Sequence, residues 1–268
     1  MHIKLGCGSG GSVISEVERS NGDGAGAAES ILLTLAFAQG QRPDVDAIAR
    51  LAGLAGATPQ FSLSHVPPAS EGWAELLAMG LTFDCTGLAP AEPAAMPAEG
   101  ALLGLERAPV GEAIGLGPGP HLADAAGMIP VLRMLTGIGT QLATLPGVQA
   151  VCWNPARCWM PVDYFRKVIA GWIAGGPFPA LGLTTLQRES DGAIVSVGLN
   201  LLIGQELRFD PAQNFAAPDI ARIAVRLIHA LIETGRLDAP HEFIGPDRET
   251  LQVAPSAQGQ QLSVSVRK

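Results

Sequence analysis

The residues best suited to chemistry gather in one short segment. Residues 153–161 read Trp-Asn-Pro-Ala-Arg-Cys-Trp-Met-Pro and follow an apolar run that is expected to form a buried strand. A polar loop at the end of such a strand is a common place for a binding crevice. In this hypothesis Arg157 contacts an anion, Asn154 orients the ligand and Trp159 supplies a flat apolar wall. The alternative is a structural loop whose tryptophans fill the core.

A second hypothesis for this segment is cysteine chemistry. Cys158 lies next to Arg157, and a neighbouring cation stabilises a thiolate, so Cys158 is a candidate for a thiol with a lowered pKa. A cysteine nucleophile also needs a general base, and no histidine lies at a spacing that ties it to Cys158. No Gly-x-Ser-x-Gly motif of a serine hydrolase occurs in the part expected to fold. The sequence therefore favours a non-enzymatic role and identifies no catalytic residue.

The other candidate site residues are scattered along the chain. His229 and Glu233 have the i, i+4 spacing of metal ligands on a helix, but they belong to its expected wet face. Glu206 and Arg208 alternate on one expected strand, so they project to one face and are expected to pair with each other or with a neighbour. Asp84 stands alone in an apolar strand and needs a buried partner. We expect no metal site and no cofactor.

Composition and charge exclude several classes of function. The chain is 47% hydrophobic and 16% charged, which is typical of well-covered layers and too apolar for disorder. Its net charge is −8, without a basic patch, so no nucleic-acid binding is expected. The four cysteines form no CxxC pair and predict reduced thiols in the cytoplasm. The long uncharged runs 134–156 and 168–187 are broken by Pro-Gly and Gly-Gly-Pro, so no membrane span is expected.

The elements expected to position these residues predict an α+β fold, with antiparallel or mixed sheets and helices packed on one face. A nearly all-apolar helix over 122–145 is expected to lie between layers. Asp191-Gly192 predicts a hairpin between strands 180–188 and 193–201, and a strand follows at 205–209. Pro218 opens an amphipathic helix that Gly235 ends.

The order of these parts divides the chain into a flexible leader, residues 1–29, and two α+β halves, 30–117 and 118–268. The leader is rich in glycine, so ordering it would cost backbone entropy with little burial in return. The two halves are expected to form one compact unit and to have ferredoxin-like arrangements.

The second half resembles the uncharacterised bacterial family DUF4261. The resemblance rests on a strand ending in Trp153, a helix that follows a proline, and the short motifs Gly-Leu-Thr-Thr at 182–185, Gly-Leu at 198–199 and Gly-Gln-Glu-Leu at 204–207. It covers residues 120–240 and implies an α+β fold. It implies no activity and no site residue.

Two functions from different classes remain. The first is a non-enzymatic binding or protein-interaction module that forms a homodimer or takes a protein partner, because its strongly apolar helices could bury surface against another chain. The second is a small-molecule enzyme or ligand-binding protein that uses Asn154, Arg157, Cys158 and Trp159.

Overall fold

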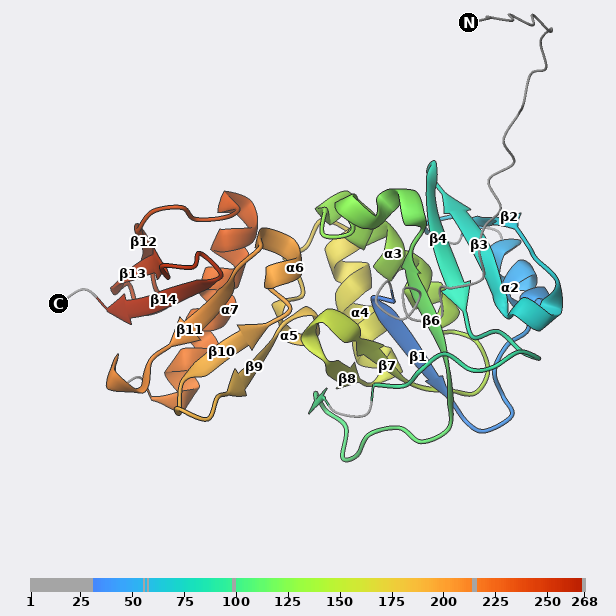
Figure 1. Cartoon of the computed structure of the whole chain (residues 1–268), viewed down its shortest axis with the longest axis horizontal. Helices are drawn as coiled ribbons and strands as arrows, with labels where there is room; N and C mark the ends of the chain where they lie inside the picture. The colour runs from blue at the N-terminus through green and yellow to red at the C-terminus, as the bar shows by residue number, and fades with distance from the viewer. Residues whose placement is uncertain (1–30, 55, 57, 98–99, 214–215, 267–268) are drawn as a thin grey trace, which may run out of the picture.

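The computed structural model describes residues 31–266 apart from 55, 57, 98–99 and 214–215. The expected leader, residues 1–29, and Cys7 lie outside these residues. The described chain is α+β, as predicted, with two mixed sheets side by side and α5 and α6 at their junction (Figure 1). In chain order the main elements are β1 (Leu33–Phe37), α2 (Val45–Ala52), β2 (Ser62–His65), β3 (Trp73–Ala78), β4 (Leu81–Thr86), β5 (Ala101–Leu102), β6 (Glu112–Pro118), α3 (Ile129–Leu142), β7 (Val148–Trp153), β8 (Cys158–Met160), α4 (Val162–Ile173), α5 (Ala180–Leu183), β9 (Thr185–Arg188), β10 (Ile194–Val197), α6 (Asn200–Ile203), β11 (Glu206–Phe209), α7 (Ala217–Thr234), β12 (His241–Ile244), β13 (Thr250–Pro255) and β14 (Gln261–Val266).

The first sheet has the order β2-β3-β4-β6-β1-β7-β8-β5. Its neighbours are antiparallel except for β5 and β8, which run parallel. When the added strands β2 and β3 are set aside, β1, α2, β4, β6, α3 and β7 follow the β-α-β-β-α-β sequence of a ferredoxin-like unit. The ferredoxin-like expectation therefore describes the centre of this sheet.

The second sheet has the order β12-β13-β14-β11-β10-β9 and is built differently. Two antiparallel three-stranded groups meet at its centre, where β11 and β14 run parallel. One long helix, α7, connects the two groups. The expectation of a ferredoxin-like second half is therefore wrong.

The sheets also divide the chain elsewhere than expected. A division between residues 117 and 118 would cut through the first sheet, because β6 pairs with β1, and β7 pairs with β1 on its other side. The strands of the first sheet continue to Met160, and those of the second begin at Thr185. Composition did not reveal this division, because the strand pairings that cross residue 117 join segments far apart in sequence. One continuous core contains buried side chains from both sheets.

Helices cover one face of the first sheet. Leu33, Leu35 and Phe37 of β1 point into the core shared with α3 and α4. The helix α3 contacts β1 and β6 and the helices α2 and α4, while α4 also contacts β7 of the same sheet. Its nearly all-apolar sequence therefore reflects burial against this sheet and its neighbouring helices, and not a position between two layers.

The opposite face of the first sheet is covered by part of the connection between β4 and β6. Met96 and Leu105 from this connection pack over a small separate cluster. The buried members of this cluster are Ala36, Ala150, Cys152 and Trp159.

Helix α7 packs on the second sheet, as predicted. Its buried side chains Ile223, Leu227 and Leu231 share the core with Leu207 and Phe209 of β11. Residues of the other face, such as Gln252 and Ser263, are exposed. The amphipathic pattern therefore located both the helix and a sheet with one wet side.

Three local expectations are wrong for identifiable reasons. The strand expected over 180–188 begins at Thr185, because residues 180–183 form α5. The strand expected over 193–201 ends at Val197, because the chain turns at Gly198, with φ +101°, into α6. The helix expected over 122–145 is a 3₁₀ turn, Pro120–Ala125, followed by α3. Between these two pieces the backbone at Gly127 lies against the carbonyl of Leu201 so closely that no side chain would fit there.

Within the described residues, no helix combines the length and the apolar character that crossing a bilayer requires.

Candidate functional site

Asn154 of the segment 153–161 has a structural role. Its side-chain amide donates hydrogen bonds to the carbonyl of Ile31 and to the hydroxyl of Thr34, both at 3.0 Å. Its backbone N–H donates to the carbonyl of Leu32 at 2.9 Å. Asn154 therefore holds the chain at the start of β1, and its amide is occupied.

Cys158 and Trp159 of the same segment lie inside the protein, each with 1% of its surface exposed. Burial raises the pKa of the Cys158 thiol to about 11, so the expectation of a lowered pKa is wrong. The desolvation of the thiolate outweighs the one opposing cause, a hydrogen bond with the backbone of Leu103, and the side chain of Arg157 is exposed. Cys85 and Cys152 are likewise buried, as predicted, and burial raises the pKa of each to about 12.

Arg157 is exposed, in contrast to Cys158 and Trp159. It adopts a left-handed backbone conformation with φ +48° after a 3₁₀ turn, and its carbonyl accepts a hydrogen bond from Ala101 at 2.8 Å. Its guanidinium has no hydrogen bond or ion pair with a described residue. Among the four proposed site residues, Cys158 and Trp159 are therefore buried, Arg157 is exposed and the Asn154 amide is already hydrogen-bonded.

Two of the three motifs quoted for the family resemblance connect the two sheets, and the third makes contacts within the second. Thr185 donates its hydroxyl to the carbonyl of Ala156 at 2.8 Å, and Gly198 approaches Ala156 and Leu183 so closely that a Cβ atom would lie 2.9 Å from the Ala156 methyl. The side chain of Gln205, fully buried, bonds both the N–H and the carbonyl of Leu237, at 2.8 and 2.9 Å. These contacts account for the motifs by structure alone.

Glu206 and Arg208 do not pair with each other, although each pairs with neighbours. The Glu206 carboxylate accepts hydrogen bonds from the backbone N–H groups of Gly198 and Asn200 at 2.8 and 2.9 Å and from the Ser196 hydroxyl. Burial raises the pKa of Glu206, while these hydrogen bonds act in the opposite direction. The carboxylate therefore fixes the turn into α6.

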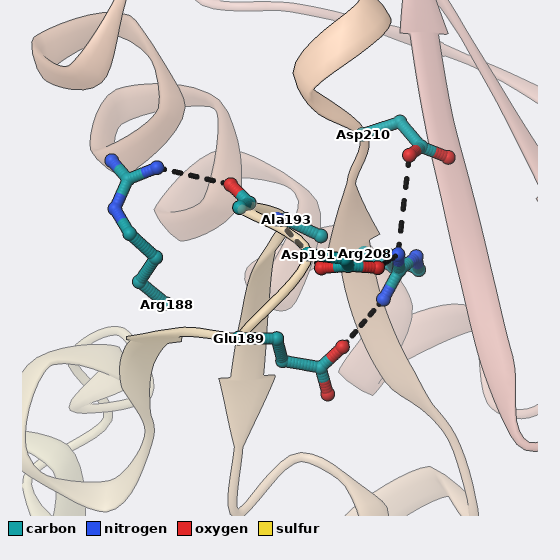
Figure 2. A network of polar contacts seen from close by, with 7 residues as sticks. Arg188, Glu189, Asp191, Ala193, Arg208 and Asp210 are labelled. Carbon is teal, nitrogen blue, oxygen red and sulfur yellow. Dashed lines mark hydrogen bonds and ion pairs between the residues drawn. The ribbon is translucent and has the colours of Figure 1, made fainter.

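Arg208 joins three carboxylates at the β9–β10 hairpin (Figure 2). It bonds Glu189 at 2.6 Å and also bonds Asp191, while Asp210 lies at 3.9 Å. Two hydrogen bonds lower the pKa of the exposed Asp191. The larger effect comes from the backbone N–H of Ala193, and the next comes from the Arg208 side chain. This network anchors the predicted Asp-Gly turn to β11.

Asp84 has polar neighbours on the face of the first sheet opposite the helices. It stands directly across from Glu75 in the β3–β4 pair. Burial, then the charge of Glu75, raises the pKa of Asp84, and His121 opposes the rise. His121 is itself hydrogen-bonded to the Thr82 hydroxyl at 3.0 Å. Among the described residues, no three His, Cys, Asp or Glu side chains are placed to hold a metal ion.

The concavity most suited to a ligand lies elsewhere, between α3, α4 and the β3–β4 turn. We call it the Met79 pocket. It has a volume of about 520 Å³, within the usual range for small-molecule sites. Its lining residues are Gly56, Thr58, Pro59, Gln60, Met79, Arg133, Met134 and Ile173.

Met79 forms one wall of this pocket in an unusual conformation. Ala78 pairs with Leu81, so Met79 and Gly80 form a two-residue turn in which both φ angles are positive, +51° and +81°. Asparagine, aspartate or glycine is preferred at the first position of such a turn. Met79 instead has 85% of its surface exposed.

The opposite wall is firmly held. The Gln141 amide donates to the carbonyl of Pro59, and the Pro59 ring lies so close to Gly137 that a Cβ atom there would be 2.5 Å away. The Arg133 guanidinium lies 5.1 Å from the centre of the Trp172 ring, which is 3% exposed. Pro59 and Arg133 are therefore held by contacts within the protein itself.

A second concavity, of about 540 Å³, lies beside Gln149 and Ala150. Its remaining lining residues, 104–110, belong to a single connection, and most of them are exposed. Sequence reasoning missed both concavities. Met79-Gly80 between two alternating strands was the available signal for the first.

No protein-family model matches the chain, and no curated protein or solved structure matches it either. The resemblance of residues 120–240 to DUF4261 therefore stays a prediction.

Proposed function

We propose that the protein is a non-enzymatic binding module and that the Met79 pocket is its binding site. The observation that carries this proposal is Met79 itself. A non-glycine residue in the left-handed region costs about 1–2 kcal/mol, and backbone strain of this kind concentrates at functional sites. Met79 gains little burial in return, since it is 85% exposed. Its flexible thioether is well suited to cover an apolar ligand.

The nucleophiles that the structure describes support binding rather than cysteine catalysis. Burial raises the pKa of Cys85, Cys152 and Cys158 to about 11 or 12, so each is a neutral thiol at pH 7. Their burial also keeps them away from a substrate. The alternative, a small-molecule enzyme or ligand-binding protein that uses the segment 153–161, stays a prediction, and the burial of Cys158 and Trp159 favours the binding module over it.

The experiment is a titration with N-phenyl-1-naphthylamine, an uncharged apolar dye that fluoresces when bound. We expect the wild-type protein to bind the dye and the Met79→Asn variant to bind it about fivefold more weakly, since about 1 kcal/mol of apolar contact is lost. The same variant should gain stability, because asparagine suits the turn better. Met128→Asn is the matched control, since Met128 is also exposed and does not line the pocket. Equal dye binding by Met79→Asn and wild type would overturn the proposal.

We also propose that the protein forms a homodimer through β12. The expected interface on apolar helices is not the basis, because the apolar residues of α3 and α7 lie in the core. β12 instead ends the second sheet and exposes 55% of Ile244, and an open edge of this kind can pair with a second strand. Light scattering should give a dimer for wild type and a monomer for Ile244→Lys; a wild-type monomer at every concentration would refute this proposal. A cytoplasmic location and the lack of nucleic-acid binding stay predictions from composition.

A further inference from the structure

The lining of the Met79 pocket indicates what kind of group it accepts. Two thioethers, one proline ring and one branched aliphatic side chain supply most of its apolar surface: Met79, Met134, Pro59 and Ile173. No aromatic ring is among the lining residues, so an apolar ligand is held there by contact with aliphatic and thioether groups and not by ring stacking. Unbranched methionine side chains adapt to flexible chains. These walls therefore suit an aliphatic chain.

One charged residue lines the same pocket. The Arg133 guanidinium has no hydrogen bond or ion pair with any described residue, and it lies 5.1 Å from the centre of the Trp172 ring. This is a free cation beside an apolar cavity in a chain with a net charge of −8. A guanidinium can lie over a ring and still present its planar fork to a carboxylate.

From these two observations we infer that the ligand of the Met79 pocket is a linear aliphatic carboxylate. The chain occupies the space between Met79, Met134 and Ile173, and the carboxylate accepts hydrogen bonds from Arg133. One guanidinium balances one negative charge, which fits a carboxylate better than a doubly charged group. The inference rests on the proposed binding function and adds the chemical class of the ligand.

The Arg133 guanidinium, which would bind the carboxylate, is already held in place by its contact with Trp172. Arg133 is positioned by Trp172, which is 3% exposed and also meets Phe178 edge-to-face at 5.3 Å. A cation that is already held loses less side-chain entropy when it binds an anion.

The test compares sodium decanoate, used below its micellar concentration, with 1-decanol, its uncharged counterpart. Each displaces N-phenyl-1-naphthylamine from the full chain. We expect decanoate to bind wild type about tenfold more tightly than 1-decanol, because one charge-assisted hydrogen bond contributes a free energy of about that size. Arg133→Gln should bring the two affinities together, and Arg133→Lys should give an intermediate ratio. Arg166→Gln, which changes an exposed arginine of α4 outside the pocket, should behave like wild type.

The outcomes separate the two proposals. If 1-decanol and decanoate both displace the dye with equal affinity from wild type, the carboxylate inference is overturned and the binding site stands. An unchanged preference for decanoate in Arg133→Gln also overturns the inference, because another group then holds the charge. If the dye itself fails to bind at the Met79 pocket, the proposed function fails first. Circular dichroism of Arg133→Gln verifies that the variant is folded.

Discussion

Replacing Gly198 by alanine tests whether the two sheets are joined by a close backbone contact. Gly198 has φ +101°, and an added Cβ atom would lie 2.8 Å from the Leu183 carbonyl and 2.9 Å from the Ala156 methyl. Gly175 is a matched control, because it has φ +95° and no atom within 4 Å of the same position. The two substitutions impose a similar backbone penalty, and only Gly198→Ala adds an overlap.

The expected losses follow from these two contributions. An alanine at positive φ costs about 1–2 kcal/mol, offset in part by the lower entropy of the unfolded chain, so Gly175→Ala should lose about 1 kcal/mol. Overlap with packed atoms adds about 2 kcal/mol, so Gly198→Ala should lose about 3 kcal/mol. Urea unfolding followed by circular dichroism measures both, provided that the slope of free energy against urea stays unchanged. Equal losses would refute the view that the approach of Gly198 to Ala156 holds the junction together.

Three further perturbations test the polar and buried groups. Burial and the facing charge of Glu75 raise the pKa of Asp84, so stability falls as pH rises through that pKa; Asp84→Asn should therefore stabilise the protein by about 0.5 kcal/mol at pH 7 and give no gain at acidic pH, and thermal melts at both pH values would show it. The raised pKa and the burial of the Cys158 thiol should prevent its alkylation by iodoacetamide in the native protein at pH 8. Rapid labelling of Cys158 itself, located by mass spectrometry of its peptide, would contradict the packing. Asn154→Ala should cost about 2 kcal/mol in urea unfolding, because the partners at Ile31 and Thr34 lose their hydrogen bonds; a neutral result would mean that water replaces the amide.

Local signals in the sequence were sufficient for several elements. The periodic apolar residues of α7 predicted a helix that begins at Pro218 and ends before Gly235. The structure has this helix at Ala217–Thr234. Asp191-Gly192 predicted the β9–β10 hairpin, because aspartate and glycine both tolerate a positive φ angle and stand between two apolar runs. These features depend on neighbours in the chain, which is why a sequence alone reveals them.

The site depended on contacts that no local pattern contains. The Met79 pocket is built from four separate segments, represented by Pro59, Met79, Arg133 and Ile173. The polar composition of residues 153–161 suggested an exposed loop, whereas pairing of β8 with β7 buries Trp159. The thiol pKa of Cys158 then follows from that burial and not from its neighbour in sequence.

The parallel pair at the centre of the second sheet constrains the order of folding during synthesis. β11 pairs with β14, so residues 206–208 must wait for residues 261–263 before that side of the strand is covered. The first sheet needs nothing beyond Met160 for its strand pairings. On the ribosome, the first sheet can therefore complete its hydrogen bonding while β11 still presents an open edge, and this interval is when the nascent chain is most exposed to wrong strand pairing.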